Sequence, residues 1–384
     1  MSRNLRSKAA AAVAAAAMGL ALIAITGPPA SAGGDHSGGG HDDDVVTVAT
    51  GLNNPRQLSV ERGHRLYIAE AGTNDSCEAV PDAPEGFEVC GLTGSVTEVR
   101  HGEQRRVVTE LPALNFLGEV VGASDVDVRW NRIAVLIGGA AAGTAARDSL
   151  GDEYAAFGTI HTGRLHWTPL TGADLRLVAD INAFEVAENP DDSEEPDSNA
   201  VGFVARGDHR WAVADAGGNT LLRASGQGVG TIAVFPNGDP VPNPTPEGPR
   251  EISPQAVPTD VTIGPDGAYY VSQLTGFPFP EGGSSIWRVT RDGAATEYAT
   301  GLTMVTSLAW RGDTLYAVQI DDEDALGEER SGSLREVTPG GSEHEAVVDD
   351  LSSPYGVAIR GHHAYVTVDS TSSGEGSVIR VDLH

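Results

Sequence analysis

Polar side chains that could bind a ligand or do chemistry recur at equivalent points of a repeated strand pair. They stand at the start of the first strand or after the second strand: Arg56, Gln57, Glu70, Asp125, Asp215, Asn219, Asp260, Gln273, Gln319, Tyr355 and Asp369. Since equivalent positions of a repeat meet around a common axis, we expect these side chains to ring the mouth of a channel. They could bind a ligand there, or they could only solvate the channel and cap neighbouring strands.

A subset of this ring has the chemistry of a metal site. Carboxylate and amide oxygens suit a hard divalent cation such as Ca²⁺, and the candidate ligands are Glu70, Asp215, Asn219, Asp260 and Asp369. The acidic runs 191–195 and 321–324 lack EF-hand spacing and are interpreted as solvated loops.

Imidazole chemistry has less support than carboxylate chemistry. Six histidines fall in or beside short turns that we place at the opposite end of the repeats: His64, His101, His209, His344, His362 and His363. Only His161 and His166 could approach the channel, so a histidine base at its mouth is poorly supported. The chain also lacks G-x-S-x-G, H-E-x-x-H and P-loop motifs.

Charge excludes further classes of function. The formal net charge is −29, from 25 Lys+Arg against 54 Asp+Glu, and Lys8 is the only lysine. Nucleic-acid binding needs cations that neutralise phosphates, so we expect no nucleic-acid partner. Once the N-terminal segment is removed, no lysine remains for Schiff-base chemistry.

The N-terminal segment predicts export. Residues 1–32 combine Arg3, Arg6 and Lys8 with an alanine-rich apolar run and a small-residue ending, so we expect a signal peptide cleaved after Ala32. Residues 33–44 form a Gly/His/Asp-rich linker, with a weak capacity to chelate a metal. In an oxidising compartment, Cys77 and Cys90 predict a disulfide.

The remaining residues, 45–384, repeat a four-strand unit. First hairpins are expected at 55–70, 123–137, 200–215, 258–273, 305–319 and 354–369, and second hairpins at 93–111, 162–181, 219–235, 284–302 and 332–351. The sixth unit, 376–383, lacks its last strand, and 45–55 supplies a spare one. This pattern predicts an all-β fold, a six-bladed β-propeller closed by the N-terminal strand; an open β-sandwich or two domains would not explain the exchange.

The extra chain length gathers at one face of the expected propeller. Connections within each hairpin are short and share one face, which we call the short-turn face. The long connections belong to the opposite, insertion face: 71–92, 138–158, 182–199, 236–255, 274–283 and 321–331. Loops on a rigid scaffold carry function more often than the turns beneath them, so the insertion face is the expected working face.

The chain resembles the ScyD/ScyE family of exported propellers. The resemblance rests on YYVSQLTGFPFPEGGSSIWRV (269–289), ADAGGNTLLR (214–223) and GLNNPRQL (51–58), and extends over nearly all of 45–384. It implies a propeller and an exported protein, but no established reaction. Gln273 and Gln319 stand where the family pattern has Glu, which weakens a metal or acid–base role there. The hairpins also look, more distantly, like those of NHL-repeat, gluconolactonase-type and quinoprotein propellers.

Three hypotheses of function follow. The leading one is a secreted, monomeric binding or accessory protein that takes a small molecule or an extracellular protein at the insertion face, without membrane attachment after cleavage. The alternative is a metal-dependent hydrolase or lactonase that uses the carboxylate ring. The third is a quinone-linked sugar oxidoreductase. Such a site needs cationic side chains to bind the carboxylates of the quinone, and only Arg56 is available.

Overall fold

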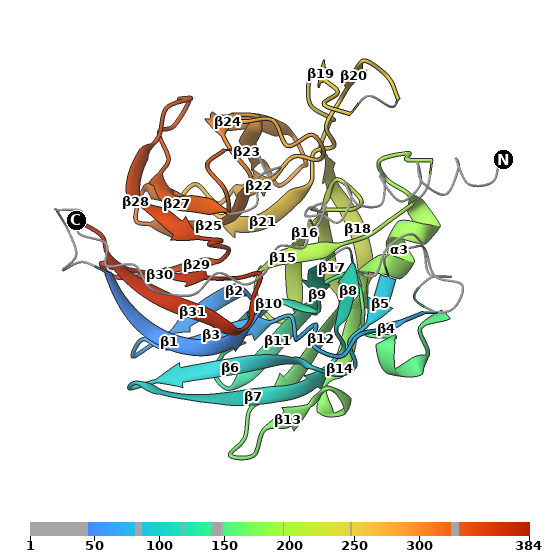
Figure 1. Ribbon diagram of the computed structural model, residues 1–384, viewed down its shortest axis with the longest axis vertical. Coiled ribbons are helices and arrows are strands. Elements are labelled where there is room, and N and C mark those ends of the chain that lie inside the picture. The colour runs from blue at the N-terminus through green and yellow to red at the C-terminus, as the bar shows by residue number, and fades with distance from the viewer. Residues whose placement is uncertain are drawn as a thin grey trace.

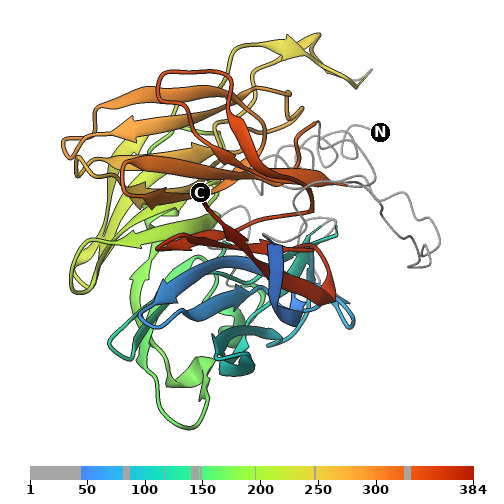
Figure 2. The same cartoon turned by 90° about the vertical axis from the view of Figure 1, so that its left-hand side faces the viewer.

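The computed structural model describes residues 45–80, 87–116, 118–139, 147, 149–194, 196–245, 248–323 and 330–384. The expected signal peptide and linker lie outside these residues. The expectation of an all-β fold is confirmed, since the described chain folds mainly as antiparallel four-stranded sheets (Figure 1, Figure 2). No helix in these ranges has the length and apolar content needed to cross a bilayer.

The first three large sheets follow the chain in order, and each strand pairs with the next. One contains β2 (Pro55–Glu61), β3 (Arg65–Glu70), β6 (Gly94–Arg100) and β7 (Glu103–Leu111). The next contains β10 (Ala123–Arg129), β11 (Arg132–Ile137), β12 (Thr159–Arg164) and β14 (Arg176–Asp180). The third contains β15 (Ala200–Ala205), β16 (Arg210–Asp215), β17 (Thr220–Ser225) and β18 (Gly228–Val234).

The C-terminal half continues the same order. One sheet contains β21 (Pro258–Ile263), β22 (Tyr269–Gln273), β23 (Ser284–Val289) and β24 (Ala295–Leu302). Another contains β25 (Val305–Arg311), β26 (Thr314–Gln319), β27 (Ser331–Glu336) and β28 (Glu345–Ser352). The last contains β29 (Val357–Arg360), β30 (His363–Val368) and β31 (Ser373–Asp382), and β1 (Val45–Asn53) pairs antiparallel with β31.

The first strands of these sheets lie next to one another. Contacts join β2 to β10, β10 to β15, β15 to β21, β21 to β25, β25 to β29, and β29 back to β2. Side chains alternate between the two faces of each strand, so each sheet packs against the sheet before it and the sheet after it. For example, Leu136 of β11 packs with Phe203 and Val213 of the next sheet.

Several insertions have structure of their own. β4 (Glu78–Ala79), β5 (Phe87–Val89), β8 (Leu114–Phe116) and β9 (Glu119–Val121) form an additional sheet that the sequence did not predict. The expected disulfide is confirmed, with Cys77 and Cys90 bonded at 1.96 Å. A small hairpin, β19 (Val241–Pro242) and β20 (Glu251–Ile252), stands apart from the large sheets in Figure 1.

The second sheet departs from the hairpin expected at 162–181. Its third strand already begins at Thr159, and residues 165–175 contain β13 (Leu170–Thr171) and the 3₁₀ turn η2 (Gly172–Asp174). β13 pairs parallel with β7 of the first sheet, and Leu170 and Leu175 are buried between the two sheets. Burial of these leucines explains why the connection folds over its neighbour instead of forming a tight turn.

Helical structure is short and lies in connections. η1 spans Asp152–Tyr154, and α3 spans Ile181–Glu188, beginning one residue before the expected insertion 182–199. The Asp180 side chain accepts the backbone N–H of Ala183 at 2.8 Å and so caps the N-terminus of α3. Arg147 holds the same carboxylate through an ion pair at 2.8 Å.

Candidate functional site

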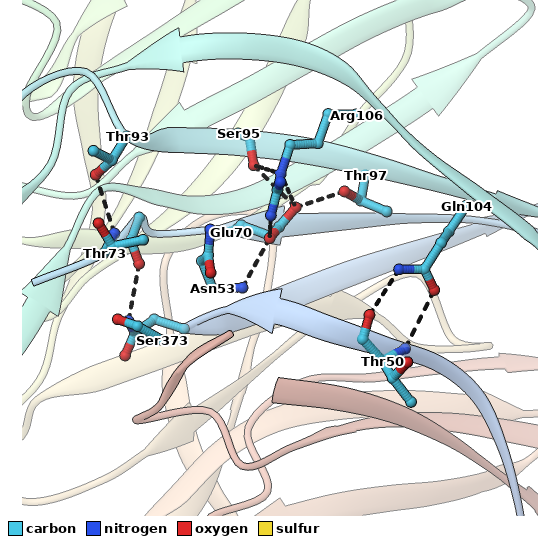
Figure 3. Close-up of polar contacts among 12 residues, drawn as sticks. Thr50, Asn53, Glu70, Thr73, Thr93, Ser95, Thr97, Gln104, Arg106 and Ser373 are labelled. Atoms are coloured by element: carbon cyan, nitrogen blue, oxygen red, sulfur yellow. Dashed lines mark hydrogen bonds and ion pairs between the residues drawn. The ribbon is translucent and has the colours of Figure 1, made fainter. Parts of the chain in front are cut away.

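Glu70, at the end of β3, is fully buried inside a network of donors (Figure 3). It accepts hydrogen bonds from the Asn53 backbone N–H at 2.8 Å, Ser95 Oγ at 2.9 Å and Thr97 Oγ1 at 2.5 Å. Arg106 forms an ion pair with it at 2.9 Å. Because these donors come from β1, β6 and β7, Glu70 ties the N-terminal strand to the first sheet and keeps little capacity for a ligand.

The residues at the equivalent position of two other sheets also accept hydrogen bonds from neighbouring segments. Asp215, at the end of β16, accepts the backbone N–H of Asn199 at 2.7 Å and Ser198 Oγ at 2.8 Å. Gln319, at the end of β26, accepts the backbone N–H of Thr303 at 2.9 Å. Burial raises the pKa of Asp215 to about 6, although these donors favour its charged form.

The other residues of the predicted ring that follow a second strand are Gln273, Asn219 and Asp369. Gln273 and Asn219 also have hydrogen-bond partners within the protein. Gln273 Oε1 accepts the indole N–H of Trp287 at 3.0 Å. Asn219 donates to Asp191 Oδ2 at 2.9 Å and accepts the Val257 backbone N–H at 3.1 Å. Asp369 is half-buried just after β30, with a φ of 51°.

The candidate metal ligands are therefore distributed over different sheets. Each of Glu70, Asp215 and Asn219 serves its own sheet and the connection next to it, as described above. In the described ranges, no three side chains of His, Cys, Asp or Glu come together in a way that could hold a metal ion.

Asp125 and Asp260 lie on the inner strands and line a central cavity of about 130 Å³. The same cavity is lined by Gln57, Ser59, Asp127 and Thr262, so it extends along the first strands toward the short-turn face. The sequence placed both aspartates at the insertion mouth. In the structure they belong to the interior of the channel.

Backbone amides satisfy both aspartates. Asp125 accepts the Val126 N–H at 2.6 Å and, across the sheet boundary, the Phe203 N–H at 2.8 Å. Asp260 accepts the Val261 N–H at 2.7 Å and, from the next sheet, the Leu308 N–H at 2.9 Å. Each carboxylate thus joins its own inner strand to the next one.

Burial opposes the charged state of this pair. Burial and the nearby charge of Asp260 raise the pKa of Asp125 well above its ordinary value. Burial likewise raises the pKa of Asp260 to about 6, against the backbone hydrogen bonds that lower it. The interior of the channel is therefore a place where protons are retained more strongly than on the surface.

At the insertion face, Arg56 and Tyr355 occupy the channel mouth. Arg56 is 6% exposed and donates to the carbonyl oxygens of Ser370 and Val120, each at 2.7 Å. Its guanidinium lies 5.0 Å from the centroid of the Tyr355 ring. Burial raises the pKa of Tyr355 to about 12, more than the neighbouring Arg56 lowers it, so this phenol stays neutral.

A pocket of about 40 Å³ lies beside this pair. Its lining includes the polar side chains of Arg56, Glu119, Ser124, Asn199 and Tyr355. A water needs about 10–15 Å³ of such volume, so the pocket has room for a small polar group.

Glu119, which lines this pocket, forms an incomplete ion pair with Arg330. Arg330 Nη2 donates to Glu119 Oε1 at 3.0 Å, and Arg56 Nη2 lies 3.8 Å from Glu119 Oε2. A guanidinium and a carboxylate often form two parallel bonds. Here Glu119 Oε2 and Arg330 Nη1 are buried, and neither has a hydrogen-bond partner in the part of the chain that the structure describes.

Sequence reasoning missed both residues of this pair. Glu119 begins β9 of the additional sheet, in a stretch without the length of an insertion. Arg330 closes the acidic segment 321–331, where a single cation among carboxylates was the available signal.

The loop that carries the family resemblance supports the mouth. Phe279, within the GFPFP stretch, is buried in one apolar cluster with Tyr355, Val257 and Met304, and Phe277 packs against it. The Tyr355 side chain therefore lines the pocket and also packs against the GFPFP stretch, the most specific motif of the sequence.

The histidines lie away from both cavities. His64 is hydrogen bonded to the Tyr365 hydroxyl at 2.8 Å, and His363 contacts Asp382 at 2.6 Å, both in the short-turn region. Burial lowers the pKa of His161, which stands on the third strand of its sheet. Neither His161 nor His166 lines the cavities described above.

Comparisons with known proteins leave the family open. No family model and no curated protein sequence matches the chain. A solved glucose dehydrogenase is similar over 88% of this chain and 99% of its own, with 12% identity and a TM-score of 0.47. A putative 6-phosphogluconolactonase from Bacteroides uniformis covers 86% and 87%, with 16% identity and a TM-score of 0.41.

A third solved structure is the PQQ-bound aldose sugar dehydrogenase from Streptomyces coelicolor. It covers 87% of this chain and 84% of its own, with 14% identity and a TM-score of 0.36. Likeness at these levels carries no argument about what this chain binds or does.

Proposed function

We propose that the chain is an exported six-bladed β-propeller of the ScyD/ScyE kind that binds a small polar molecule at its insertion face. Six large sheets in chain order, with neighbouring first strands, support the propeller. The pairing of β1 with β31 supports closure of the last blade by the N-terminal strand. The disulfide supports export, because such bonds persist mainly in oxidising compartments.

One observation carries the binding proposal: among the described residues, Glu119 Oε2 and Arg330 Nη1 have no hydrogen-bond partner. A buried polar atom without a partner costs about 1–3 kcal/mol. A ligand that places a donor on Glu119 Oε2 and an acceptor on Arg330 Nη1 would recover that free energy. Carboxylic acids, amides and small amino acids carry both kinds of group on adjacent atoms.

The neighbours of this pair favour binding over a reaction. Arg56 is held by two carbonyl oxygens, and Tyr355 keeps its proton, so neither is poised to exchange protons at neutral pH. The carboxylates that a hydrolase would need are occupied by backbone and side-chain donors elsewhere in the sheets. We therefore propose a binding or accessory role.

A thermal-shift screen tests the proposal. The panel contains small hydroxy acids, amino acids, amides and neutral sugars at millimolar concentration. A ligand present at a hundred times its Kd stabilises the folded state by about 2.7 kcal/mol, and we expect an increase in Tm of roughly 5 °C.

Variants locate the site. Arg330→Gln should abolish the shift produced by a hit, because it removes the unpaired guanidinium nitrogen. Arg288→Gln is the matched control, since Arg288 forms an ion pair with Asp266 at 2.7 Å and is half-buried in β23, outside the lining of the pocket. A shift of equal size in Arg330→Gln, or no hit at all in the panel, would contradict the proposal.

A further inference from the structure

Two tryptophans project from the short-turn edge of the second sheet. Trp130 is 79% exposed and Trp167 is 95% exposed, whereas Trp211 is buried. A backbone hydrogen bond joins the two connections that carry them, from the Leu165 N–H to the Asn131 carbonyl at 2.8 Å. Such exposure of indole rings loses the free energy that burial would give, so it calls for a ligand that covers them.

The backbone conformation of Trp130 is a second indication that its side chain has a binding role. Trp130 and Asn131 have φ values of 53° and 65° in the tight turn between β10 and β11. A turn with both central φ values positive favours Asn, Asp or Gly, and a bulky residue there is strained. The chain keeps a tryptophan at the tip of this turn despite that strain, which points to a role for its side chain.

Arginines line the adjoining edge of the same sheet. Arg129 pairs across β10 and β11 with Arg132, and Arg132 pairs across β11 and β12 with Arg164. Directly opposed residues of neighbouring strands share one face, so three like charges stand side by side, an arrangement that destabilises a sheet. Asp127 neutralises Arg129 at 3.0 Å, but no carboxylate among the described residues forms an ion pair with Arg132 or Arg164.

Arg62 connects the two features. Its guanidinium lies 5.3 Å from the centroid of the Trp130 ring, in the turn of the preceding sheet. Within a chain of net charge −29, this edge thus combines two exposed indoles with cations that form no ion pair with a carboxylate of the described residues. We call it the Trp–Arg edge: Arg62, Trp130, Arg132, Arg164 and Trp167.

We propose that the Trp–Arg edge binds an acidic polysaccharide. The C–H face of a pyranose ring packs on an indole, and a guanidinium binds a carboxylate through paired hydrogen bonds. A purely apolar partner would leave the arginine ladder without counter-charge. A nucleic acid has a higher charge density, which the remainder of this acidic chain would repel. The edge is separate from the insertion pocket, so this proposal stands independently of that one.

Affinity electrophoresis and calorimetry with polygalacturonate in calcium-free buffer test it. We expect micromolar to millimolar binding that weakens with salt, as charge pairing requires. Trp167→Ala and the double variant Arg132→Ser/Arg164→Ser should each weaken binding about tenfold, a loss of about 1.4 kcal/mol. Arg250→Ser, at an exposed position near β20, is the matched charge control and should bind as the parent chain does.

A stability measurement separates binding from folding. Trp130→Asn suits the positive φ of the turn, so its Tm should equal or exceed that of the parent chain while binding weakens. Equal binding of dextran would overturn the role of charge, and equal binding of polyglutamate would overturn the role of the sugar ring. Failure to bind polygalacturonate, or unchanged binding in the three variants, would overturn the proposal.

Discussion

The interior of the channel and its insertion mouth both contain buried charged groups, but the hydrogen bonds of these groups differ between the two regions. In the interior, Asp125 and Asp260 each accept backbone N–H groups from two neighbouring sheets. At the mouth, Glu119 and Arg330 share one hydrogen bond, and one atom of each has no hydrogen-bond partner within the described part of the chain. The first arrangement completes the fold, whereas the second leaves hydrogen-bonding capacity for a ligand.

This difference shows why the residue type alone did not locate the site. Aspartates on the inner strands have the chemistry of a catalytic or metal-binding ring. Their oxygens instead satisfy amides where two sheets meet, which is a requirement of the backbone. A carboxylate at a mouth has to be judged by whether its lone pairs are already occupied.

The largest expected effect comes from removing charge in the interior without changing shape. Asp260→Asn replaces one acceptor oxygen by an NH₂ group that must face a backbone N–H, either of Val261 or of Leu308. We expect a loss of about 3 kcal/mol in the free energy of unfolding, measured with urea.

Glu119→Gln is the matched variant at the mouth. It can keep the acceptor for Arg330 and place its NH₂ group at the unpaired position, so we expect a loss below about 1 kcal/mol. Equal losses in the two variants would remove the distinction between the interior and the mouth.

A smaller effect is expected at Glu185 of α3, a fully buried carboxylate whose two oxygens have no hydrogen-bond partner within the described ranges. Burial, with repulsion from Asp215, raises its pKa to about 8. The folded state then holds the proton more tightly than the unfolded state, so stability is lost as pH rises from about 4.5 to about 8.

Glu185→Gln should remove this loss. We expect the variant to be more stable than the parent chain by about 2 kcal/mol at pH 8.5, and of similar stability at pH 4. Urea unfolding at the two pH values measures the difference. A destabilised variant at pH 8.5 would show that the carboxylate has a favourable partner when it is charged.

The smallest effect expected is a pH dependence carried by Asp215 at the rim. Its pKa is raised to about 6, so the folded state loses stability as pH rises from about 4 to about 6. We expect a contribution of about 1 kcal/mol to the free energy of unfolding. Asp215→Asn should flatten this part of the stability–pH curve, and an unchanged slope would assign it to other groups.

The sequence predicted the local elements well and the long-range contacts poorly. Hairpins such as 200–215 were visible because alternating apolar residues flank a Gly-Asp-His turn, a signal contained in one segment. β5 and β8 have three residues each and pair over a long separation, so no periodicity marked the additional sheet. The contact between Glu119 and Arg330 spans 211 positions and has no local signature.

Soaking crystals with small polar fragments tests the central claim most directly. Glycine, acetate, acetamide and glycerol are each small enough to place a polar group in the mouth pocket. We predict that a fragment is found in contact with Glu119 Oε2 and Arg330 Nη1, and that soaked crystals of Arg330→Gln lack it. Fragments bound at Asp125 and Asp260 with an empty mouth would contradict the division between a satisfied interior and a ligand-binding mouth.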